Sequence, residues 1–489
     1  MSYFIISLDS GTTSARAVLF NEAGEVVALE QKEFTQIYPK SGWVEHDPLE
    51  ILKAQTEVLD DLLSKHQKPI LAMGITNQRE TTIVWDRQTG DPIYNAIVWQ
   101  DKRTSEKCAT LKASGLSEYC KKATGLILDP YFSGTKIAWI LDNVEGARAR
   151  AQRGELCFGT VDSWLLWNLT DSKVHATDPS NASRTLLYNI QSMDWDDRML
   201  EALNVPRSIL PEVKESASIF GTHNDIPIAA IMGDQQSALF GQTCFTPGTA
   251  KNTYGTGCFM LMNTGSAIPE TPSGLLNTVA WQIGGQTTYA LEGSVFVAGA
   301  AMQWLRDGLK LISTTHESSE IASSEAAINP DSTVIVVPAF AGLGTPYWDM
   351  DARGAVLGLT RDSDSNALIR ATLESLAYQS MDVLKAMQED SGISLFTLQV
   401  DGGASANDYL MQFQADLLGV SLERPKSIES TALGVAMMAS VTMGEKVLAE
   451  LKCTVEVDRV FSSEKSVEWR NEKTALWEDA IRRVRTNAV

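Results

Sequence analysis

Apolar and polar residues follow one another along this chain in short segments that have either strand or helix periodicity. Apolar runs bounded by turn residues predict strands in the N-terminal part at residues 3–8, 15–20, 26–30, 71–76 and 82–85. Apolar residues at helical spacing predict a helix over residues 48–63, with Asp47 as its N-cap. The expected apolar face of this helix consists of Leu49, Leu52, Thr56, Leu59 and Leu63. Because strands and helices alternate throughout the chain, we predict an α/β fold.

The second half of the chain repeats the strand–turn pattern of the first. Residues 249–262 predict two strands joined by a Gly-Thr-Gly turn, and residues 395–400 predict a strand that runs into Asp401-Gly402-Gly403. A helix that ends at Gly419 follows this strand. A glycine-containing turn after a strand in each half favours two related domains, residues 1–243 and 244–489, that face each other across a cleft. The chain closes with a charged helix expected over residues 468–489, whose apolar side carries Leu476, Trp477 and Ile481.

Length and charge narrow the classes of partner. At 489 residues the chain is too long for a single core, which agrees with two large domains. The 41 basic and 61 acidic residues give a formal charge of −20. Such a chain repels nucleic acid and anionic membrane, so we expect neither as a stable partner. An anionic substrate would need local neutralisation by a metal ion, arginine or backbone donors.

The expected location is the cytoplasm. The apolar runs, of which residues 334–340 are an example, are much shorter than the roughly 20 residues that a membrane span requires. The N-terminus shows no basic segment followed by a cleavage site. The six cysteines are scattered, without a Cys-x-x-Cys pair, so we expect reduced and mostly buried thiols and no structural zinc site.

The first candidate for chemistry is the turn over residues 9–16. It combines the carboxylate of Asp9, the small residues Ser10-Gly11-Thr12-Thr13-Ser14 and the guanidinium of Arg16. Backbone N–H groups and hydroxyls in such a turn can bind phosphate oxygens while the aspartate holds a hydrated magnesium ion. An ordinary hairpin with small polar turn residues explains the same sequence equally well. The Walker A pattern and the nucleophile elbow are absent, which disfavours a P-loop NTPase and an α/β-hydrolase.

Five further residues could take part in chemistry on a small polyol. Arg79 and Glu80 follow a predicted strand and can donate to and accept from neighbouring hydroxyls, although a surface ion pair is the simpler explanation. Trp99 and Tyr131 supply rings that can stack on a short carbon chain. Asp234 lies between the apolar segment 226–232 and a predicted helix, where it can accept a proton or, more commonly, cap the helix.

Taken together, the motifs resemble those of the FGGY carbohydrate kinases over essentially the whole chain. The motifs that carry the resemblance are Asp9-Ser10-Gly11-Thr12-Thr13-Ser14, Asn77-Gln78-Arg79-Glu80-Thr81, Val98-Trp99-Gln100-Asp101, Tyr131-Phe132-Ser133-Gly134-Thr135-Lys136, Gly233-Asp234-Gln235-Gln236, Thr253-Tyr254-Gly255-Thr256-Gly257, Gln303-Trp304-Leu305, Gly342-Leu343-Gly344-Thr345-Pro346-Tyr347-Trp348 and Asp401-Gly402-Gly403. Each motif alone is weak evidence for the resemblance, whereas the presence of all of them in this order is strong evidence. The Arg-Glu, Trp and Tyr motifs indicate glycerol rather than a sugar as the acceptor.

The resemblance implies two actin-like, ribonuclease H-like ATPase domains with the nucleotide and the substrate in the cleft between them. It implies transfer of the γ-phosphoryl group of ATP to a terminal hydroxyl of glycerol, which gives sn-glycerol 3-phosphate, with Asp234 as the general base. The implied glycerol-binding residues are Arg79, Glu80, Trp99, Tyr131, Asp234, Gln235 and Phe259. The implied nucleotide-binding residues are Thr12, Thr13, Ser14, Arg16, Thr256, Gly299, Gln303, Gly403 and Asn407. Asp9 is the implied magnesium residue, and the expected assembly is a homodimer or homotetramer.

Two alternatives remain open at this stage. A related kinase that acts on a pentulose or a longer polyol would share the nucleotide residues and differ in the acceptor pocket. An ATP-driven binding module of the same superfamily would bind ATP without Arg79, Glu80, Trp99 and Tyr131. A panel of acceptors separates these possibilities.

Overall fold

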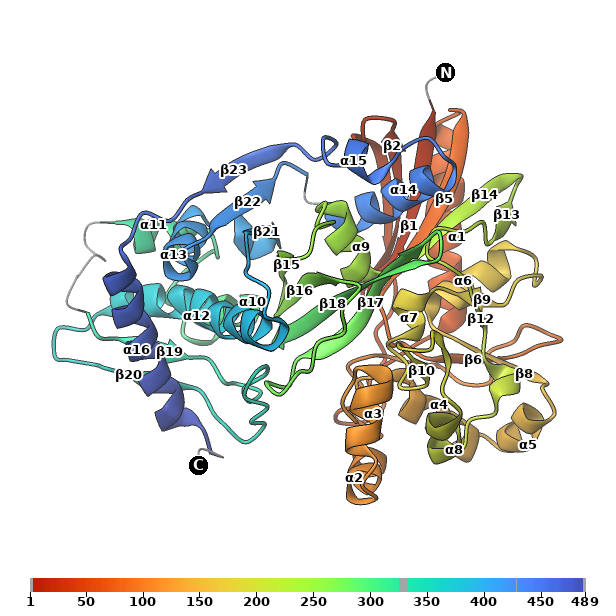
Figure 1. Ribbon diagram of the computed structural model, residues 1–489, viewed down its shortest axis with the longest axis horizontal. Coiled ribbons are helices and arrows are strands. Elements are labelled where there is room, and N and C mark those ends of the chain that lie inside the picture. The colour runs from red at the N-terminus through yellow and green to blue at the C-terminus, as the bar shows by residue number, and fades with distance from the viewer. Residues whose placement is uncertain (1–2, 325–331, 428, 487–489) are drawn as a thin grey trace. The chain divides into compact units, whose positions relative to one another are not determined.

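The expected alternation of strands and helices is present in the computed structural model, which describes residues 3–324, 332–427 and 429–486 (Figure 1). The chain forms two compact units, each of which is discontinuous in sequence. The first unit contains the chain up to Thr243, residues 277–290 and residues 429–455. The second contains residues 244–276, 291–427 and the described residues from 456 on.

A six-stranded mixed sheet organises the first unit. Its order is β13-β14-β5-β1-β2-β3, where β1 pairs antiparallel with β2 and parallel with β5. The strands are β1 (Phe4–Ser10), β2 (Ser14–Asn21), β3 (Val26–Glu33), β5 (Ile70–Asn77), β13 (Gly221–His223) and β14 (Ile226–Gly233). The strands predicted at residues 3–8, 15–20, 26–30 and 71–76 are therefore confirmed. The hairpin register pairs Asp9 with Arg16, so the two charged residues of the first turn lie opposite each other.

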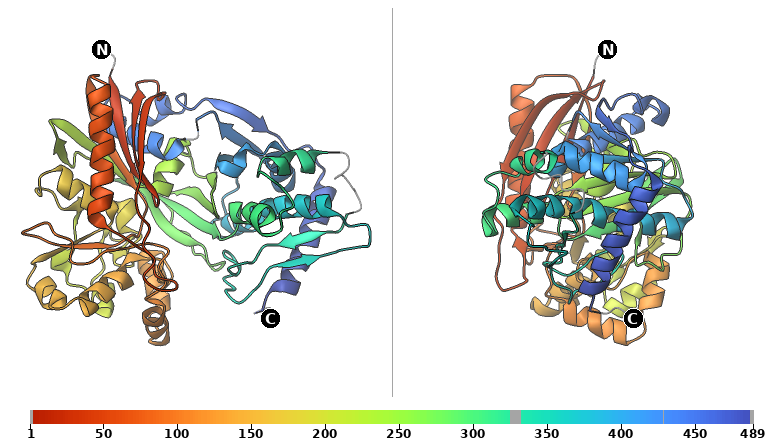
Figure 2. Two further views of the ribbon diagram at one scale, coloured as in Figure 1. Left: turned by 180° about the vertical axis from the view of Figure 1, so that it is seen from behind. Right: turned by 90° about the vertical axis from the view of Figure 1, so that its left-hand side faces the viewer.

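Helix α1 (Pro48–Lys65) covers one face of this sheet, and α14 (Ser430–Thr442) covers the other, as Figures 1 and 2 show. Asp47 caps α1 as predicted, because its side chain accepts from the N–H of Leu49 at 2.9 Å. The predicted apolar face of α1 is wrong in part, because Leu49 faces solvent and is 53% exposed. The residues that the helix buries are Pro48, Ile51, Ala54, Gln55, Val58, Leu59 and Leu62. Gln55 helps to select this face, because its amide donates to the carbonyl of Arg16 at 2.9 Å.

Helix α14 also packs tightly against α9 (Asp234–Gly241). A Cβ atom on Gly434 would lie 1.8 Å from the carbonyl oxygen of Ser237, and one on Gly241 would lie 2.0 Å from that of Ser430. The Ser237 hydroxyl donates to the carbonyl of Thr431 at 2.7 Å. Glycine at these two positions therefore permits the backbones of the two helices to come into direct contact.

Shorter elements complete the first unit. Four two-stranded sheets pair β4 (Glu45–His46) with β7 (Ala96–Ile97), β6 (Ile83–Asp86) with β8 (Leu156–Gly159), β9 (Ala176–Thr177) with β12 (Glu212–Val213) and β10 (Tyr188–Asn189) with β11 (Asp194–Trp195). The strand expected at residues 82–85 is confirmed as β6. The other helices are α2 (Ser105–Ala113), α3 (Ser117–Thr124), α4 (Ser133–Asn143), α5 (Ala147–Gln152), α6 (Val161–Leu169), α7 (Pro179–Ala182), α8 (Asp197–Leu203) and α15 (Leu448–Leu451).

A seven-stranded sheet with the order β17-β18-β16-β15-β21-β22-β23 holds the strands of the second unit, and residues 277–290 of β17 and β18 are grouped with the first unit. Its strands are β15 (Thr249–Tyr254), β16 (Cys258–Gly265), β17 (Leu276–Ile283), β18 (Gln286–Val295), β21 (Thr397–Gly402), β22 (Ser421–Pro425) and β23 (Val457–Phe461). As in the first unit, a strand pairs antiparallel with the next one across a tight turn and parallel with a later strand on its other side. The order β18-β16-β15-β21-β22 therefore repeats the order β3-β2-β1-β5-β14. This duplicated sheet is the arrangement of actin-like ATPases.

The helices of the second unit pack around one apolar core. They are α10 (Gly299–Gln303), α11 (Glu317–Ser323), α12 (Ser365–Ser391), α13 (Asp408–Leu418) and α16 (Val467–Val484), and β19 (Ile335–Val337) pairs with β20 (Ala355–Leu357). The helix predicted to end at Gly419 is confirmed as α13, because Gly419 is its left-handed C-cap with φ +70°. The closing helix is confirmed as α16, which buries Trp477 and Ile481. Its predicted last residues, 487–489, lie outside the described part of the chain.

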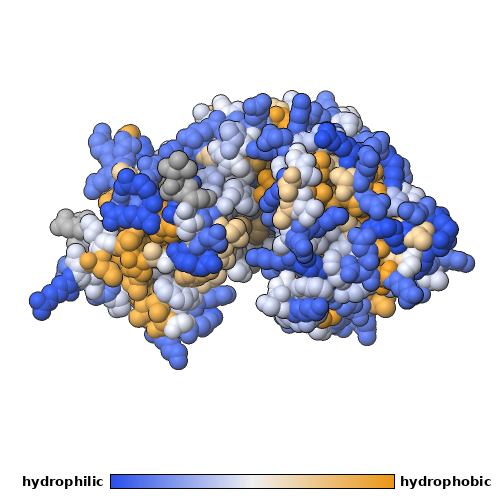
Figure 3. Space-filling view, turned by 90° about the horizontal axis from the view of Figure 1, so that it is seen from below, coloured by the Kyte–Doolittle hydropathy of each residue, from blue (hydrophilic) through white to orange (hydrophobic). Residues whose placement is uncertain are grey.

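The expectation of reduced and mostly buried thiols is confirmed. Five of the six cysteines are buried, Cys453 is exposed, and all six are free thiols. Within residues 3–324, 332–427 and 429–486, no helix is both long enough and apolar enough to span a bilayer. Figure 3 shows a face on which hydrophilic side chains cover much of the surface and apolar ones gather in patches between them.

Candidate active site

The turn between β1 and β2 in the first unit gathers three charged side chains. Asp9, at the end of β1, is 2% exposed, and Arg16 on β2 binds its carboxylate. The same guanidinium binds Glu429, just before α14, with 2.7 Å between Nη1 and Oε2. Burial raises the pKa of the Asp9 carboxyl above its usual range, and the adjacent Arg16 opposes that shift. Arg16 is therefore fixed between two carboxylates beside the turn.

Polar side chains that are buried or partly buried donate to the carbonyl groups of this turn. Gln36 donates to the carbonyl of Thr12 at 3.0 Å, and Gln78 donates to that of Gly11 at 3.0 Å. His46 lies between the two glutamines, with Nε2 2.8 Å from the Gln36 oxygen and Nδ1 3.5 Å from the Gln78 amide. Burial lowers the pKa of His46 to about 4, so the ring is neutral at pH 7 and can donate at one nitrogen while it accepts at the other. The network fixes the backbone of the turn without using its N–H groups.

Arg79 and Asp234 form the centre of a second cluster in the same unit. Arg79 follows β5, Asp234 begins α9, and their Nε and Oδ1 atoms are 3.2 Å apart. The Arg79 side chain is 2% exposed, whereas that of Asp234 is 29% exposed. Gly233 makes this contact possible, because a Cβ atom there would lie 2.8 Å from the Arg79 side chain. The pair therefore presents a partly accessible carboxylate beside a buried guanidinium.

The capping interpretation of Asp234 is wrong. Gly233 is the N-cap of α9, and Asp234 is the first helical residue. Its Oδ1 accepts from the N–H of Gln235, its immediate neighbour, at 2.7 Å. The Asp234 carboxylate therefore does not cap the helix from the N-cap position, and its contact with Arg79 is compatible with a role as proton acceptor.

Glu80 lies beside Arg79 in an uncommon backbone conformation. Its φ angle is +62°, in the left-handed region that costs a non-glycine residue about 1–3 kcal/mol. Its carboxylate is 3.9 Å from Arg79 Nε and binds Arg184 Nε at 2.6 Å. The side chains of Glu80 and Arg184 are 2% exposed or less. The simpler interpretation of a surface ion pair is therefore wrong, because Arg79, Glu80 and Arg184 form a buried cluster of charges.

Aromatic rings border the same cluster. Trp99 and Tyr131 meet edge to face, with 5.7 Å between ring centroids, and Tyr131 also contacts Phe132. The Tyr131 hydroxyl lies 3.5 Å from Arg79 Nη2. The indole N–H of Trp99 donates to the hydroxyl of Thr12 at 3.0 Å. Trp99 therefore connects the Arg79 cluster to the first turn.

In the second unit, the turn after β15 carries Thr256. Its carbonyl accepts from the N–H groups of Ala298 and Ala300 at 2.9 and 3.2 Å, which places the start of α10 against the turn. Gly299 is required there, since a Cβ atom would lie 2.6 Å from the Gly255 carbonyl oxygen. The side chains of Thr256 and Gln303 are exposed.

The remaining candidates of the second unit have distinct surroundings. Gly403 opens the short helix after β21, where a Cβ atom would meet no other atom within 4 Å. Asn407 caps α13, because its Oδ1 accepts from the Leu410 N–H at 3.0 Å and from the Ser319 hydroxyl at 3.1 Å. Its amide NH₂ is the part of the side chain that remains for a ligand. Phe259 lies on β16 opposite Thr253 and is half-buried.

Sequence reasoning missed several side chains of the first unit. Arg184 follows the run Ser180-Asn181-Ala182-Ser183, which carries no recognisable signal, and Lys136 stands in a motif to which the sequence assigns no role for it.

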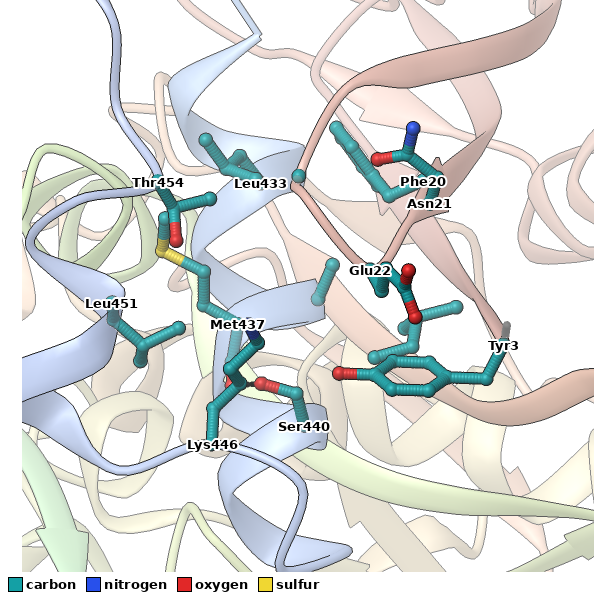
Figure 4. A pocket seen from close by; sticks show the side chains of 13 residues that line it. Tyr3, Phe20, Asn21, Glu22, Leu433, Met437, Ser440, Lys446, Leu451 and Thr454 are labelled. Carbon is teal, nitrogen blue, oxygen red and sulfur yellow. Dashed lines mark hydrogen bonds between the residues drawn. The ribbon is translucent and has the colours of Figure 1, made fainter. Parts of the chain in front are cut away.

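A small pocket between the N-terminal strands and helices α14 and α15 is lined by Phe20, Leu433, Met437 and Lys446, among others (Figure 4). Its volume of about 20 Å³ holds roughly one water molecule, so it cannot take a polyol or a nucleotide.

Two family models match this chain. The N-terminal domain of the FGGY family of carbohydrate kinases matches residues 4–241, and the C-terminal domain of the same family matches residues 250–443. The chain belongs to the FGGY family of carbohydrate kinases.

Relatives within that family are similar over the full length. The chain is 56% identical to the glycerol kinase of Fusobacterium nucleatum over 99% of both chains, and 55% identical to that of Shewanella baltica over the same shares. The crystal structure of Plasmodium falciparum glycerol kinase with ADP superposes with a TM-score of 0.93 at 36% identity, over 99% of this chain and 98% of that one. A gluconate kinase from Lactobacillus acidophilus shares the fold, with a TM-score of 0.90 at 22% identity over 100% and 99% of the two chains.

Proposed function

We propose that this protein is a transferase that moves the γ-phosphoryl group of ATP to a terminal hydroxyl of glycerol and forms sn-glycerol 3-phosphate. The observation that carries the proposal is the pair of buried Arg79 and partly exposed Asp234, with 3.2 Å between Nε and Oδ1, bordered by Glu80, Trp99 and Tyr131. The similarity to glycerol kinases over 99% of the chain supports the choice of acceptor.

The acceptor is small and has three hydroxyl groups, which suits this cluster. In the proposal, Arg79 donates to one hydroxyl, Glu80 accepts from a neighbouring one, and Tyr131 and Gln235 complete the polar contacts. The indole of Trp99 lies along the carbon chain. Phe259 is a further candidate for an apolar contact with the acceptor.

Asp234 acts as the general base in this proposal. The neighbouring Arg79 guanidinium favours its ionised form, and the 29% exposure of its side chain leaves the carboxylate accessible to a substrate hydroxyl. As the hydroxyl oxygen attacks the γ-phosphorus, the carboxylate accepts the proton. Phosphoryl transfer needs positioning and charge neutralisation more than covalent chemistry, so one correctly placed carboxylate suffices.

Phosphate groups bind to the turn after β1 through the N–H groups and hydroxyls of Thr12, Thr13 and Ser14, with Arg16 as the cation. Thr256, Gly299, Gln303, Gly403 and Asn407 are the further candidates for nucleotide contacts. Gly403, which has open space around its Cα, lets a ligand approach the backbone closely.

The residues around Asp9 fit a magnesium ion. Magnesium prefers oxygen ligands and is commonly bound by one or two carboxylates together with substrate phosphates and water. Asp9 is a buried carboxylate near the end of β1, where the chain enters the phosphate turn. When bound, the ion neutralises charge on the triphosphate.

A coupled assay of ADP release tests the proposal. We expect turnover with glycerol to exceed turnover with dihydroxyacetone, and xylulose to be a poor acceptor. Higher kcat/KM with xylulose would instead indicate the pentulose kinase alternative. ADP release that does not depend on any acceptor would indicate the ATP-driven binding module.

We also propose that the enzyme acts in the cytoplasm as a homodimer or homotetramer. Light scattering on the purified chain distinguishes these assemblies from a monomer of 53.4 kDa.

A further inference from the structure

The backbone carbonyl of Glu80 is held by three side-chain donors. Its carbonyl oxygen accepts from the Thr82 hydroxyl at 3.0 Å, from the Ser133 hydroxyl at 3.0 Å and from Lys136 Nζ at 3.4 Å. Ser133 and Lys136 both lie on the first turn of α4. Because Glu80 has a φ angle of +62°, these contacts oppose its relaxation to an ordinary conformation.

Lys136 also contacts the second polar residue of the proposed acceptor site. Its ammonium donates to the carbonyl of Tyr131 at 2.5 Å, and its side chain is fully buried. One ammonium group thus joins the backbones of Glu80 and Tyr131. A buried cation is costly, so its presence here needs an explanation beyond packing. Burial lowers its pKa to about 8, and the negative charge of Glu80 opposes this shift.

Arg184 holds the other end of Glu80. Its Nε donates to the Glu80 carboxylate at 2.6 Å, and its guanidinium lies 5.7 Å from the ring centroid of Tyr131 and 5.2 Å from that of Phe132. The Arg184 side chain is fully buried. It therefore contacts both residues whose backbones Lys136 joins.

We propose that Lys136 and Arg184 are positioning residues that fix Glu80 and Tyr131 for recognition of the acceptor hydroxyls. The inference rests on the proposed function, since it assigns Glu80 and Tyr131 to the acceptor. Neither cation is a catalytic residue. Lys136 sets the backbone of the two residues, and Arg184 sets the direction of the carboxylate.

The consequence is selectivity for the number of hydroxyls. A rigid, buried acceptor such as Glu80 rejects an analogue that lacks the matching hydroxyl, because the carboxylate is then left without its partner. A loosely held carboxylate rejects it less. Loss of either cation should therefore weaken glycerol binding and also reduce the discrimination between glycerol and 1,3-propanediol, which lacks the central hydroxyl.

The test measures KM for glycerol at saturating ATP and KM for ATP at saturating glycerol. For Lys136→Met we expect KM for glycerol to rise about 10- to 100-fold, the range of a misplaced binding group, while KM for ATP stays near the wild-type value. Lys136→Arg, which keeps the charge, should recover part of the loss. Ser133→Ala removes one donor without changing the charge and should raise KM for glycerol by a smaller factor. Lys112→Met, at an exposed position on α2, is the matched control and should leave both constants unchanged.

Arg184→Lys and Ser133→Ala keep the test decisive if Lys136→Met does not fold. A folded variant of Lys136, Ser133 or Arg184 with wild-type KM for glycerol and wild-type discrimination against 1,3-propanediol would overturn the inference. Equal losses for glycerol and ATP would also overturn it, because that pattern indicates general damage. Failure of the wild-type protein to phosphorylate glycerol would instead refute the proposed function, so the two failures are distinguishable.

Discussion

Asp234→Asn separates the chemical role of this residue from its structural one. Asparagine has the same shape, and its oxygen can still accept from the Gln235 N–H and from Arg79 Nε, which contact Oδ1 at 2.7 and 3.2 Å in the wild type. The amide cannot accept the proton of an attacking hydroxyl. We therefore expect the variant to fold and to bind ATP but to lose most of its turnover.

The structure allows both effects to be given a size. A positioned general base contributes about 10²–10⁴ in rate, which corresponds to roughly 3–5 kcal/mol in the barrier. Breaking a fully buried ion pair costs about 3–5 kcal/mol of stability, but the Asp234 side chain is 29% exposed and Arg79 retains a carboxylate of Glu80 at 3.9 Å. We therefore expect the free energy of unfolding to fall by only about 1 kcal/mol.

The assay compares kcat, KM for ATP and the thermal midpoint of the variant with those of the wild type. Asp225→Asn is the matched control, because Asp225 is exposed in the turn before β14 and its φ of +63° suits asparagine equally well. A kcat of Asp234→Asn within about threefold of the wild type, a difference under 1 kcal/mol in the barrier, would refute the assignment of Asp234 as the base.

Two further predictions concern stability. Gly434→Ala places a Cβ atom 1.8 Å from the Ser237 carbonyl oxygen, so α9 and α14 must separate. We expect the free energy of unfolding to fall by about 1–3 kcal/mol, measured as a lower thermal midpoint. An unchanged midpoint would contradict the close packing of the two helices. Asp382 is a buried carboxyl that accepts from Trp477 Nε1 at 2.7 Å, and burial raises its pKa from 3.8 to about 7. The folded state therefore keeps a proton that the unfolded state has released, and this group lowers the free energy of unfolding as pH rises from about 4 to about 7. Asp382→Asn removes this pH dependence. The stability of the variant relative to the wild type, followed by thermal midpoints, should therefore increase between pH 5 and pH 7.5, by at most about 1.4 kcal/mol per pH unit. A difference that stays constant with pH would contradict the titration of Asp382.

Local sequence signals predicted the parts of the fold that depend on neighbouring residues. The β1–β2 hairpin, the Asp47 cap and the Gly419 stop each follow from a few adjacent side chains, and the structure contains all three. The apolar face of α1 was predicted less well. The helix carries apolar residues on two overlapping faces, and which face is buried depends on the sheet and on the Arg16 carbonyl that accepts from Gln55.

Features that depend on distant residues could not be predicted. Residues 429–455 return to the first unit, where Glu429 binds Arg16, a contact between positions 413 residues apart. Arg184 reaches Glu80 across 104 residues from a segment of small polar side chains. Likewise, the sequence left a helix cap open as the commoner role of an aspartate at position 234, and the structure excludes it because Gly233 is the N-cap of α9.

The hydrogen bond from the Trp99 indole to the Thr12 hydroxyl limits how the acceptor preference of this scaffold can change. Widening the proposed acceptor site by replacing Trp99 with a smaller residue would also remove a support of the turn to which we assign the triphosphate. A variant redesigned for a bulkier alcohol thus needs a compensating donor for Thr12. Engineering of the two substrates cannot proceed independently at this position.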